Sequence, residues 1–192
     1  MSLKNLTIGT SALALSLALG AVGPTVSFAE AAKTIEVGGA PMYSSKNIIE
    51  NASKSKDHTT LVTAVKAADL VATLSSDGPF TVFAPTNAAF EKLPKDTVPT
   101  LLKPENKAQL TDVLTYHVVA GKYSAEKIAA DADANGGELM LKTVEGKQIT
   151  LKKQGDGWVV IDSKGTEAAI TIADVGQSNG IIHVIDSVLL PN

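Results

Sequence analysis

The sequence predicts an α+β fold with a mostly antiparallel sheet, and the change in its hydrophobic periodicity is the main reason. Between residues 57 and 130, apolar residues recur every three or four positions, which is the spacing of amphipathic helices. From residue 139 onward the apolar spacing becomes two, which indicates strands with one buried face. Because the helices come first and the strands follow, the chain is typical of an α+β domain and not of repeated βαβ units.

Residues 1–29 are predicted to be a secretory signal peptide. Lys4 is followed by an apolar run over 6–22, and Ser27 and Ala29 fit the small-residue positions of a cleavage site. The alternative is an uncleaved membrane anchor, but an apolar run of about 17 residues, diluted by small polar ones, is short for a span. We therefore expect an exported protein, periplasmic or secreted, with no membrane span after cleavage.

Two further segments complete the predicted domain plan. Residues 30–45 are expected to form an N-terminal arm, because they are rich in small and polar residues, with Ile48 and Ile49 as its anchor to the core. Residues 46–191 are expected to form one domain, since this stretch contains no internal repeat and no low-complexity linker.

The first predicted helix begins after a cap supplied by Asp57 or Thr59. Apolar residues continue at helical spacing over 61–74, where a second short helix is expected to be capped by Asp69. The turn residues 75–79 end this stretch.

A short buried strand, residues 80–84, is predicted to lead directly into the next helix. Thr86 can cap that helix, residues 87–93, and Pro94 ends it. The prolines in residues 99–104 predict a bend before a longer helix.

The longer helix is predicted to open at Pro104 and Glu105, because proline fits the first helical turn and an acid favours the positive end of the helix dipole. A smaller helix, residues 125–130, follows with Ser124 as its cap. The buried face of the longer helix is expected to contain Leu110, Val113, Leu114 and His117.

The strands are predicted from alternating apolar residues and from turn signals. Glu145-Gly146 and Asn179-Gly180 are the expected hairpin turns, and Asn179-Gly180 is the stronger signal. Asn135-Gly136-Gly137 marks the turn between the last helix and the first of these strands. The predicted strands are residues 139–144, 147–151, 158–161, 169–175 and 181–190.

Composition excludes several classes of function. All 17 basic residues are lysines and the formal net charge is −3, which argues against nucleic acid as a partner, because arginine and a basic surface are the usual means of binding phosphate. The absence of cysteine excludes disulfides, thiol nucleophiles and thiolate metal sites. The three histidines, His58, His117 and His183, are not paired at ligand spacing, so no metal or other cofactor is predicted.

Three stretches, in this order, resemble the fasciclin-type domain family. They are TVFAPTNAAFEKLP at residues 81–94, LTYHVVAGK at 114–122 and NGIIHVIDSVLLP at 179–191. The resemblance covers about residues 40–191 and implies a single domain, with a β-sandwich-like wedge of mostly antiparallel strands and several helices. It further implies a bacterial exported protein with a role in adhesion. The sequence lacks an RGD tripeptide, so integrin-type adhesion is not implied.

Tyr116 and His117 are the candidate partner-binding residues, because the resemblance implies that fasciclin-type domains use this pair in adhesive contacts. The residues themselves also allow a structural role, in which a buried His117 ring bonds a carbonyl or carboxylate and fixes the corner between helix and strand. For Tyr116 we expect a packed ring with its hydroxyl near solvent. Asp186 is expected to accept hydrogen bonds from backbone donors of a neighbouring loop.

Two functions follow as expectations. The first is an exported, non-catalytic interaction module, a monomer that binds a protein or cell-surface component in adhesion, aggregation or host contact. The alternative is a periplasmic small-ligand-binding protein, which a deep apolar pocket between helix and sheet would favour. The sequence contains no nucleophile elbow, phosphate-binding loop or dinucleotide glycine pattern, so no enzyme is predicted.

Overall fold

A computed structural model describes residues 34–192 of the protein. The predicted signal peptide, residues 1–29, therefore lies outside the described residues. Within residues 34–192, no helix combines the length and the apolar character that crossing a bilayer requires. The fold is α+β, as the periodicity predicts.

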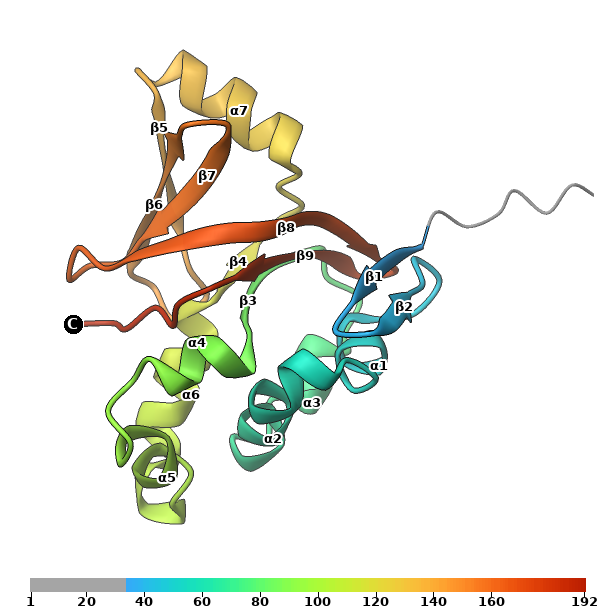
Figure 1. The fold of residues 1–192 in the computed structure, drawn as a ribbon, viewed down its shortest axis with the longest axis vertical. Coiled ribbons are helices and arrows are strands. Elements are labelled where there is room, and N and C mark those ends of the chain that lie inside the picture. Colours follow the sequence, from blue (N-terminus) through green and yellow to red (C-terminus); the bar gives the residue numbers. More distant parts are fainter. Residues whose placement is uncertain (1–33) are drawn as a thin grey trace, which may run out of the picture. The chain divides into compact units, whose positions relative to one another are not determined.

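A seven-stranded sheet forms the centre of the fold, in the order β4-β3-β9-β8-β7-β6-β5 (Figure 1). All neighbouring strands are antiparallel except the pair β3 and β9, which is parallel. The strands are β3 (Phe80–Pro85), β4 (Val118–Ala120), β5 (Glu138–Lys142), β6 (Gln148–Gln154), β7 (Gly157–Ile161), β8 (Glu167–Gln177) and β9 (Gly180–Ile185).

The sheet bends into a wedge with two halves, which we call its leaves: β5, β6 and β7 form one, and β4, β3 and β9 form the other. The long strand β8 belongs to both leaves. The start of β8 pairs with β7, and the rest pairs with β9 across two register shifts, after Ile170 and after Ile172. Such irregularities increase the local twist and change the direction of a strand. At the far ends, the edge strands meet again, because the Val144 N–H donates to the Val118 carbonyl and Val119 bridges to Thr143.

The helices divide between two sides of the wedge. Figure 1 shows α7 beside β5, β6 and β7, whereas the other helices lie on the other side of β3 and β9. The helices are α1 (Ile48–Ala52), α2 (Thr59–Ala67), α3 (Val71–Leu74), α4 (Asn87–Glu91), α5 (Thr97–Leu101), α6 (Lys107–Tyr116) and α7 (Ala125–Ala134), with single 3₁₀ turns at Lys56–His58 and Pro104–Asn106.

The two sides have separate hydrophobic clusters. The helical core lies between the sheet and helices α1, α2, α3 and α6, and its members include Ile48, Leu61, Val65, Leu114, Val118 and Ile182. The wedge core lies between the leaves of the sheet and α7, and its members include Phe83, Tyr116, Ile128, Leu151, Val160 and Leu189. Helices α1, α2, α3, α6 and α7 therefore reach the interior through apolar residues on one face.

The described part of the predicted N-terminal arm contains a hairpin. Strands β1 (Ile35–Val37) and β2 (Ala40–Met42) pair antiparallel, and the side chains of Val37 and Met42 are buried in the helical core. Ile48 is also buried there, so its predicted anchoring role is confirmed. The hairpin buries apolar surface that the polar composition of the segment did not indicate.

The predicted helix caps are confirmed at two helices and wrong at two others. The side chains of Thr86 and Ser124 accept from backbone N–H groups of α4 and α7, as predicted. The predicted caps at the start of α2 and α3 are wrong, since neither helix has a side-chain bond from its N-cap residue. The Thr60 N–H of α2 instead donates to Oδ1 of Asn87, at 3.0 Å. A residue of the next motif therefore caps this helix through tertiary contact.

Other boundaries also differ from the prediction. The bend predicted at residues 99–104 overlaps helix α5, which tolerates Pro99 because this residue falls in the first turn, where its missing N–H breaks no helical bond. The last strand ends at Ile185, and residues 186–192 continue as a tail without helix or strand. The final hairpin turns at Ser178 and Asn179, since Gln177 pairs with Gly180.

Candidate functional site

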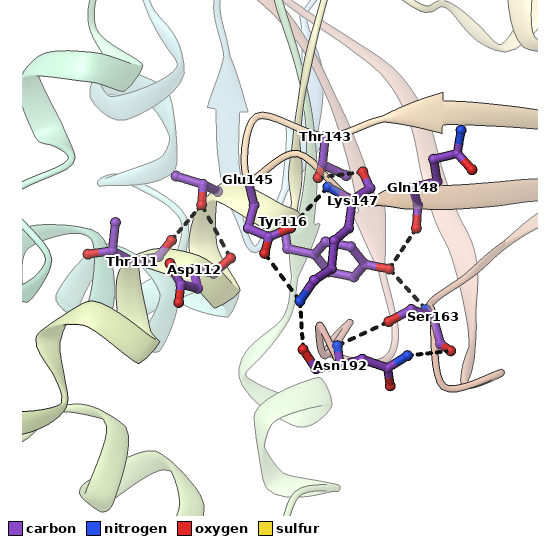
Figure 2. Close-up of polar contacts among 10 residues, drawn as sticks. Thr111, Asp112, Tyr116, Thr143, Glu145, Lys147, Gln148, Ser163 and Asn192 are labelled. Atoms are coloured by element: carbon purple, nitrogen blue, oxygen red, sulfur yellow. Dashed lines mark hydrogen bonds and ion pairs between the residues drawn. The ribbon is translucent and has the colours of Figure 1, made fainter.

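The candidate site is the corner where α6 ends and β4 begins. Tyr116 is the last residue of α6, and its side chain is completely buried. Its hydroxyl donates to the Gln148 carbonyl and accepts from the Ser163 N–H, both at 2.9 Å (Figure 2). The expectation that this hydroxyl lies near solvent is wrong, because two backbone groups of the wedge satisfy it inside.

His117 is buried beside Tyr116 and bridges two segments of the chain. Its Nδ1 lies 2.7 Å from the Val113 carbonyl, one turn back in α6. Its Nε2 lies 3.0 Å from the Leu189 amide, which can only donate. The hydrogen bonds therefore assign the proton to Nδ1, and the ring is neutral. The structural role expected for His117, a buried ring bonded to a carbonyl at the corner, is present.

Burial lowers the pKa of His117 to about 4, because a charged imidazolium would be desolvated. The Val113 carbonyl and the negative charge of Asp162 oppose this shift without overcoming it. The ring therefore stays neutral at physiological pH, and its two hydrogen bonds keep their directions.

The corner also holds the tail, residues 186–192, which is the end of the third fasciclin-like motif. The Leu190 N–H donates to Asp162 Oδ2 at 3.0 Å, next to the bond between Leu189 and His117. The amide of Asn192 donates to Ser163 Oγ at 3.1 Å, and its carbonyl accepts from Lys147 Nζ at 2.6 Å. Figure 2 shows the contacts of Asn192 with Ser163 and Lys147, near the Tyr116 ring. Residues from three distant segments thus fix the backbone of the tail.

Asp162 is positioned by the turn between β7 and β8. Its Oδ1 accepts from the backbone N–H groups of Lys164 and Thr166, at 2.9 and 2.8 Å. These bonds orient the other oxygen, Oδ2, toward the tail. Sequence reasoning missed Asp162 as a site residue, although an aspartate three residues before Gly165 is a local turn signal.

An open groove lies against the corner and the tail. Its volume is about 370 Å³, and its rim carries two acids and two lysines. Val113 and Leu190 form part of its wall. The Val113 carbonyl bonds to the His117 ring, and Leu190 directly follows Leu189, whose N–H donates to the same ring. We call this cavity the corner groove; its charged residues are Asp112, Glu145, Lys147 and Lys164.

The other two histidines are also buried and separate from the corner. His58 Nδ1 lies 2.9 Å from Ser55 Oγ, and His183 Nε2 lies 2.7 Å from the Tyr123 carbonyl. Burial lowers the pKa of both rings. Within residues 34–192, no three histidine, aspartate or glutamate side chains are grouped closely enough to hold a metal ion.

Asp186 begins the tail and accepts from a backbone donor, as expected, but the donor is the Ala169 N–H of strand β8, at 2.8 Å, and not a group in a loop. Partial burial alone would raise the pKa of Asp186, but hydrogen bonds from Lys92, Ala169 and Ser187 lower it. Trp158, the only tryptophan, is half-buried and packs against the wedge core.

Tyr116 and His117 therefore lie together, as their adjacency requires, but both rings face the interior, with at most 2% of their surface exposed. Every polar atom of the two side chains has a partner within the domain. Their role in binding a partner stays a prediction, and any partner would contact the surface above them.

Comparisons with known proteins indicate one family. The model of the Fasciclin domain matches residues 56–191. Protein sll1483 of Synechocystis sp. is 47% identical over 171 residues, which are 88% of each chain. Immunogenic protein MPB70 of Mycobacterium bovis is 37% identical over 145 residues, which are 73% of this chain and 66% of that protein.

A solved structure has the same fold at lower sequence identity. It is a FAS1 domain pair from the insect cell adhesion molecule Fasciclin I, with a TM-score of 0.68 and 20% identity. The match covers 76% of this chain and 51% of that one. The family model and the relatives agree with this fold, and the protein belongs to the fasciclin domain family.

Proposed function

We propose that the protein is an exported, non-catalytic interaction module that binds a protein or cell-surface partner in adhesion, aggregation or host contact. Membership of the fasciclin domain family carries the proposal, because an adhesion molecule of insects is built from domains of this fold. The three histidines add support, since each is buried with a lowered pKa and bonded within the domain, which suits scaffolding better than proton transfer.

The proposed contact surface is the corner groove. The two acids and two lysines on its rim suit a polar protein segment or a hydroxyl-rich glycan. Tyr116 and His117 act beneath it as positioning residues, because they hold α6 and the tail, whose residues Val113 and Leu190 form part of the wall. The partner-binding role of the pair is thus indirect in this proposal.

The domain plan is part of the same proposal. Residues 1–29 direct export and are removed, residues 30–45 precede the domain, and residues 46–191 carry the function as a monomer. Periplasm and external medium both suit a chain without cysteine and without a predicted anchor.

The test is binding of labelled mature protein to intact cells of the producing organism. Lys164→Glu reverses a charge on the groove rim, and Lys66→Glu is the matched control on α2, because both lysines are exposed and neither belongs to an ion pair within residues 34–192. We expect saturable binding that Lys164→Glu weakens about tenfold and Lys66→Glu leaves unchanged.

Two results would contradict the proposal. Binding that never saturates would remove the interaction function itself. Saturable binding that both variants weaken equally would keep the function but remove the corner groove as its surface, since only net charge would then matter.

A small-ligand-binding function is the second candidate, and one observation favours it. An open groove of about 380 Å³ lies among α2, α4 and α5, and most of its surface is apolar. This volume falls within the range of small-molecule sites. Its apolar residues are Phe90, Leu93, Pro94 and Val98. Thermal melts with a panel of small apolar compounds test it: a ligand-dependent rise in Tm that Val98→Glu abolishes supports this function.

A further inference from the structure

The chain contains two Asn-Gly sequences, and the fold places them in opposite environments. They are Asn135-Gly136, after α7, and Asn179-Gly180, in the last hairpin. An asparagine before glycine is chemically labile, because no Cβ shields the following backbone nitrogen from the side-chain amide. The reaction needs freedom of the asparagine side chain and of the following peptide, so the surroundings decide which site reacts.

Asn135 has this freedom. It is exposed at the C-terminal end of α7, and a single side-chain hydrogen bond holds it, from Nδ2 to the Asp131 carbonyl at 2.6 Å. The Gly136 N–H has no hydrogen-bond partner within residues 34–192. A Cβ placed on Gly136 or Gly137 would meet nothing within 4 Å, so this turn has open space around it.

Asn179, in contrast, is fixed by burial and by hydrogen bonds. Its side chain is buried, with Oδ1 accepting from the Ile48 N–H at 3.0 Å. Its Nδ2 donates to the carbonyls of Leu74 and Ser76, both at 2.8 Å. Gly180 begins β9 so close to β3 that an added Cβ would lie 2.1 Å from the Phe80 carbonyl oxygen. Cyclisation here would break three hydrogen bonds and displace a central strand.

From this contrast we propose that Asn135 is a site of spontaneous deamidation in the folded protein and that the fold protects Asn179. The Gly136 nitrogen attacks Cγ of Asn135, a C–N bond forms, and the side-chain amide nitrogen leaves as ammonia. Water then opens the resulting succinimide at either carbonyl and gives aspartate or isoaspartate. The net reaction consumes one water, releases ammonia and needs no oxidant, reductant or enzyme.

The product changes the end of α7. A carboxylate appears at the negative end of the helix dipole, in a last turn that already contains Asp131 and Asp133 and no basic residue. Isoaspartate also lengthens the backbone between α7 and β5. Since Ala132 of this turn is completely buried in the wedge core, the modified form loosens the contact between α7 and the sheet. The deamidated fraction of the protein therefore increases with the time since the chain folded.

The test is incubation of the full mature chain, folded, in mildly alkaline buffer, with peptide mass spectrometry of both sites over time. We expect an acidic charge variant to accumulate, with Asn135 deamidating about tenfold or more faster than Asn179, because reaction at Asn179 must wait for local opening. Asn135→Gln removes the favourable ring size with little change in polarity, and this variant should not form the acidic species.

The same incubation in denaturant supplies the control for the fold. Without structure both sites precede glycine in a free chain, so their rates should become similar. Two results would overturn the proposal: equal rates at the two sites in the folded protein, or an unmodified Asn135 in the folded protein under conditions in which the denatured chain reacts at both sites.

Discussion

The helical core and the corner are stabilised by different means. Most of the helical core consists of aliphatic side chains that contact one another, such as Leu61, Val65 and Ile182. The corner instead buries a tyrosine, a histidine and an aspartate whose polar atoms bond to backbone groups 28 to 72 residues away. The first kind of contact tolerates rearrangement, whereas the second fails when one partner is lost, because a buried donor or acceptor is then unpaired.

This difference predicts that the corner is more sensitive to mutation and to pH than the helical core. It also assigns the fasciclin-like motif at residues 114–122 a structural purpose, since this motif joins a helix, a strand and the tail.

Tyr116→Ala should have the largest effect. It removes a completely buried ring and both hydroxyl bonds, so we expect it to lower the free energy of unfolding by about 4–5 kcal/mol, measured by urea denaturation. Leu61→Ala in the helical core should cost about 2–3 kcal/mol. Tyr116→Phe keeps the ring and should cost about 1–3 kcal/mol. Equal losses for Tyr116→Ala and Leu61→Ala would remove the contrast between the two regions.

The acid dependence of stability should come largely from His117. Its pKa is about 4 in the folded protein and near 6.5 in the unfolded chain, so between these values only the unfolded chain binds the proton. The free energy of unfolding should therefore fall as pH decreases from 6.5 to 4, by about 3 kcal/mol from this residue. The lowered pKa values of His58 and His183 act in the same direction.

The variant His117→Gln separates these contributions, because glutamine has no proton to gain. Urea denaturation at several pH values should show a shallower acid loss for His117→Gln than for the native protein. Identical pH profiles would mean that the corner does not contribute to acid sensitivity.

His117→Ala at neutral pH should lower the free energy of unfolding by about 2–3 kcal/mol, because the Val113 carbonyl and the Leu189 N–H lose their partner. Thermal melts and the cell-binding assay should then be compared. A variant that melts normally yet binds no partner would identify the histidine as a contact residue and contradict its structural assignment.

Asn87→Ala should show the smallest effect, about 1 kcal/mol, because it removes the long-range cap of α2. Asn87 also donates to the Lys56 carbonyl at 2.8 Å, so the loss includes the turn before the helix. Hydrogen exchange should become faster in the first turn of α2 and stay unchanged at the corner. Faster exchange at both places would mean that the two regions are not independent.

Local features of the fold could be predicted from the sequence. Thr86 and Ser124 cap the helices that follow them, because the cap and the amide that it bonds are three residues apart. Strands 80–84 and 158–161 were predicted close to their observed bounds, since a short apolar run between turn signals has few other solutions. The family resemblance supplied the wedge, which periodicity alone did not indicate.

Features that depend on distant residues could not be predicted. Asn179 is predicted as a turn residue, yet its side chain bonds to backbone groups of Ile48, Leu74 and Ser76, all more than 100 residues away in the chain. The position of Tyr116 at a helix end suggested a hydroxyl near solvent, but Gln148 at the start of β6 and Ser163 in the turn after β7 bond to it inside the domain. In the sequence, Asp162 cannot be distinguished from other acids in turns. The bond from the Leu190 N–H to its Oδ2 forms only when the tail is folded against the corner.

The most direct test of the central claim is nuclear magnetic resonance of the His117 ring. The account holds that a neutral ring, protonated at Nδ1, ties α6 to the tail. Ring nitrogen shifts should show the Nδ1–H tautomer, and no protonation should occur as pH falls until about 4. A ring that titrates near 6.5, or one protonated at Nε2, would contradict the account, because the Leu189 amide would then face another donor.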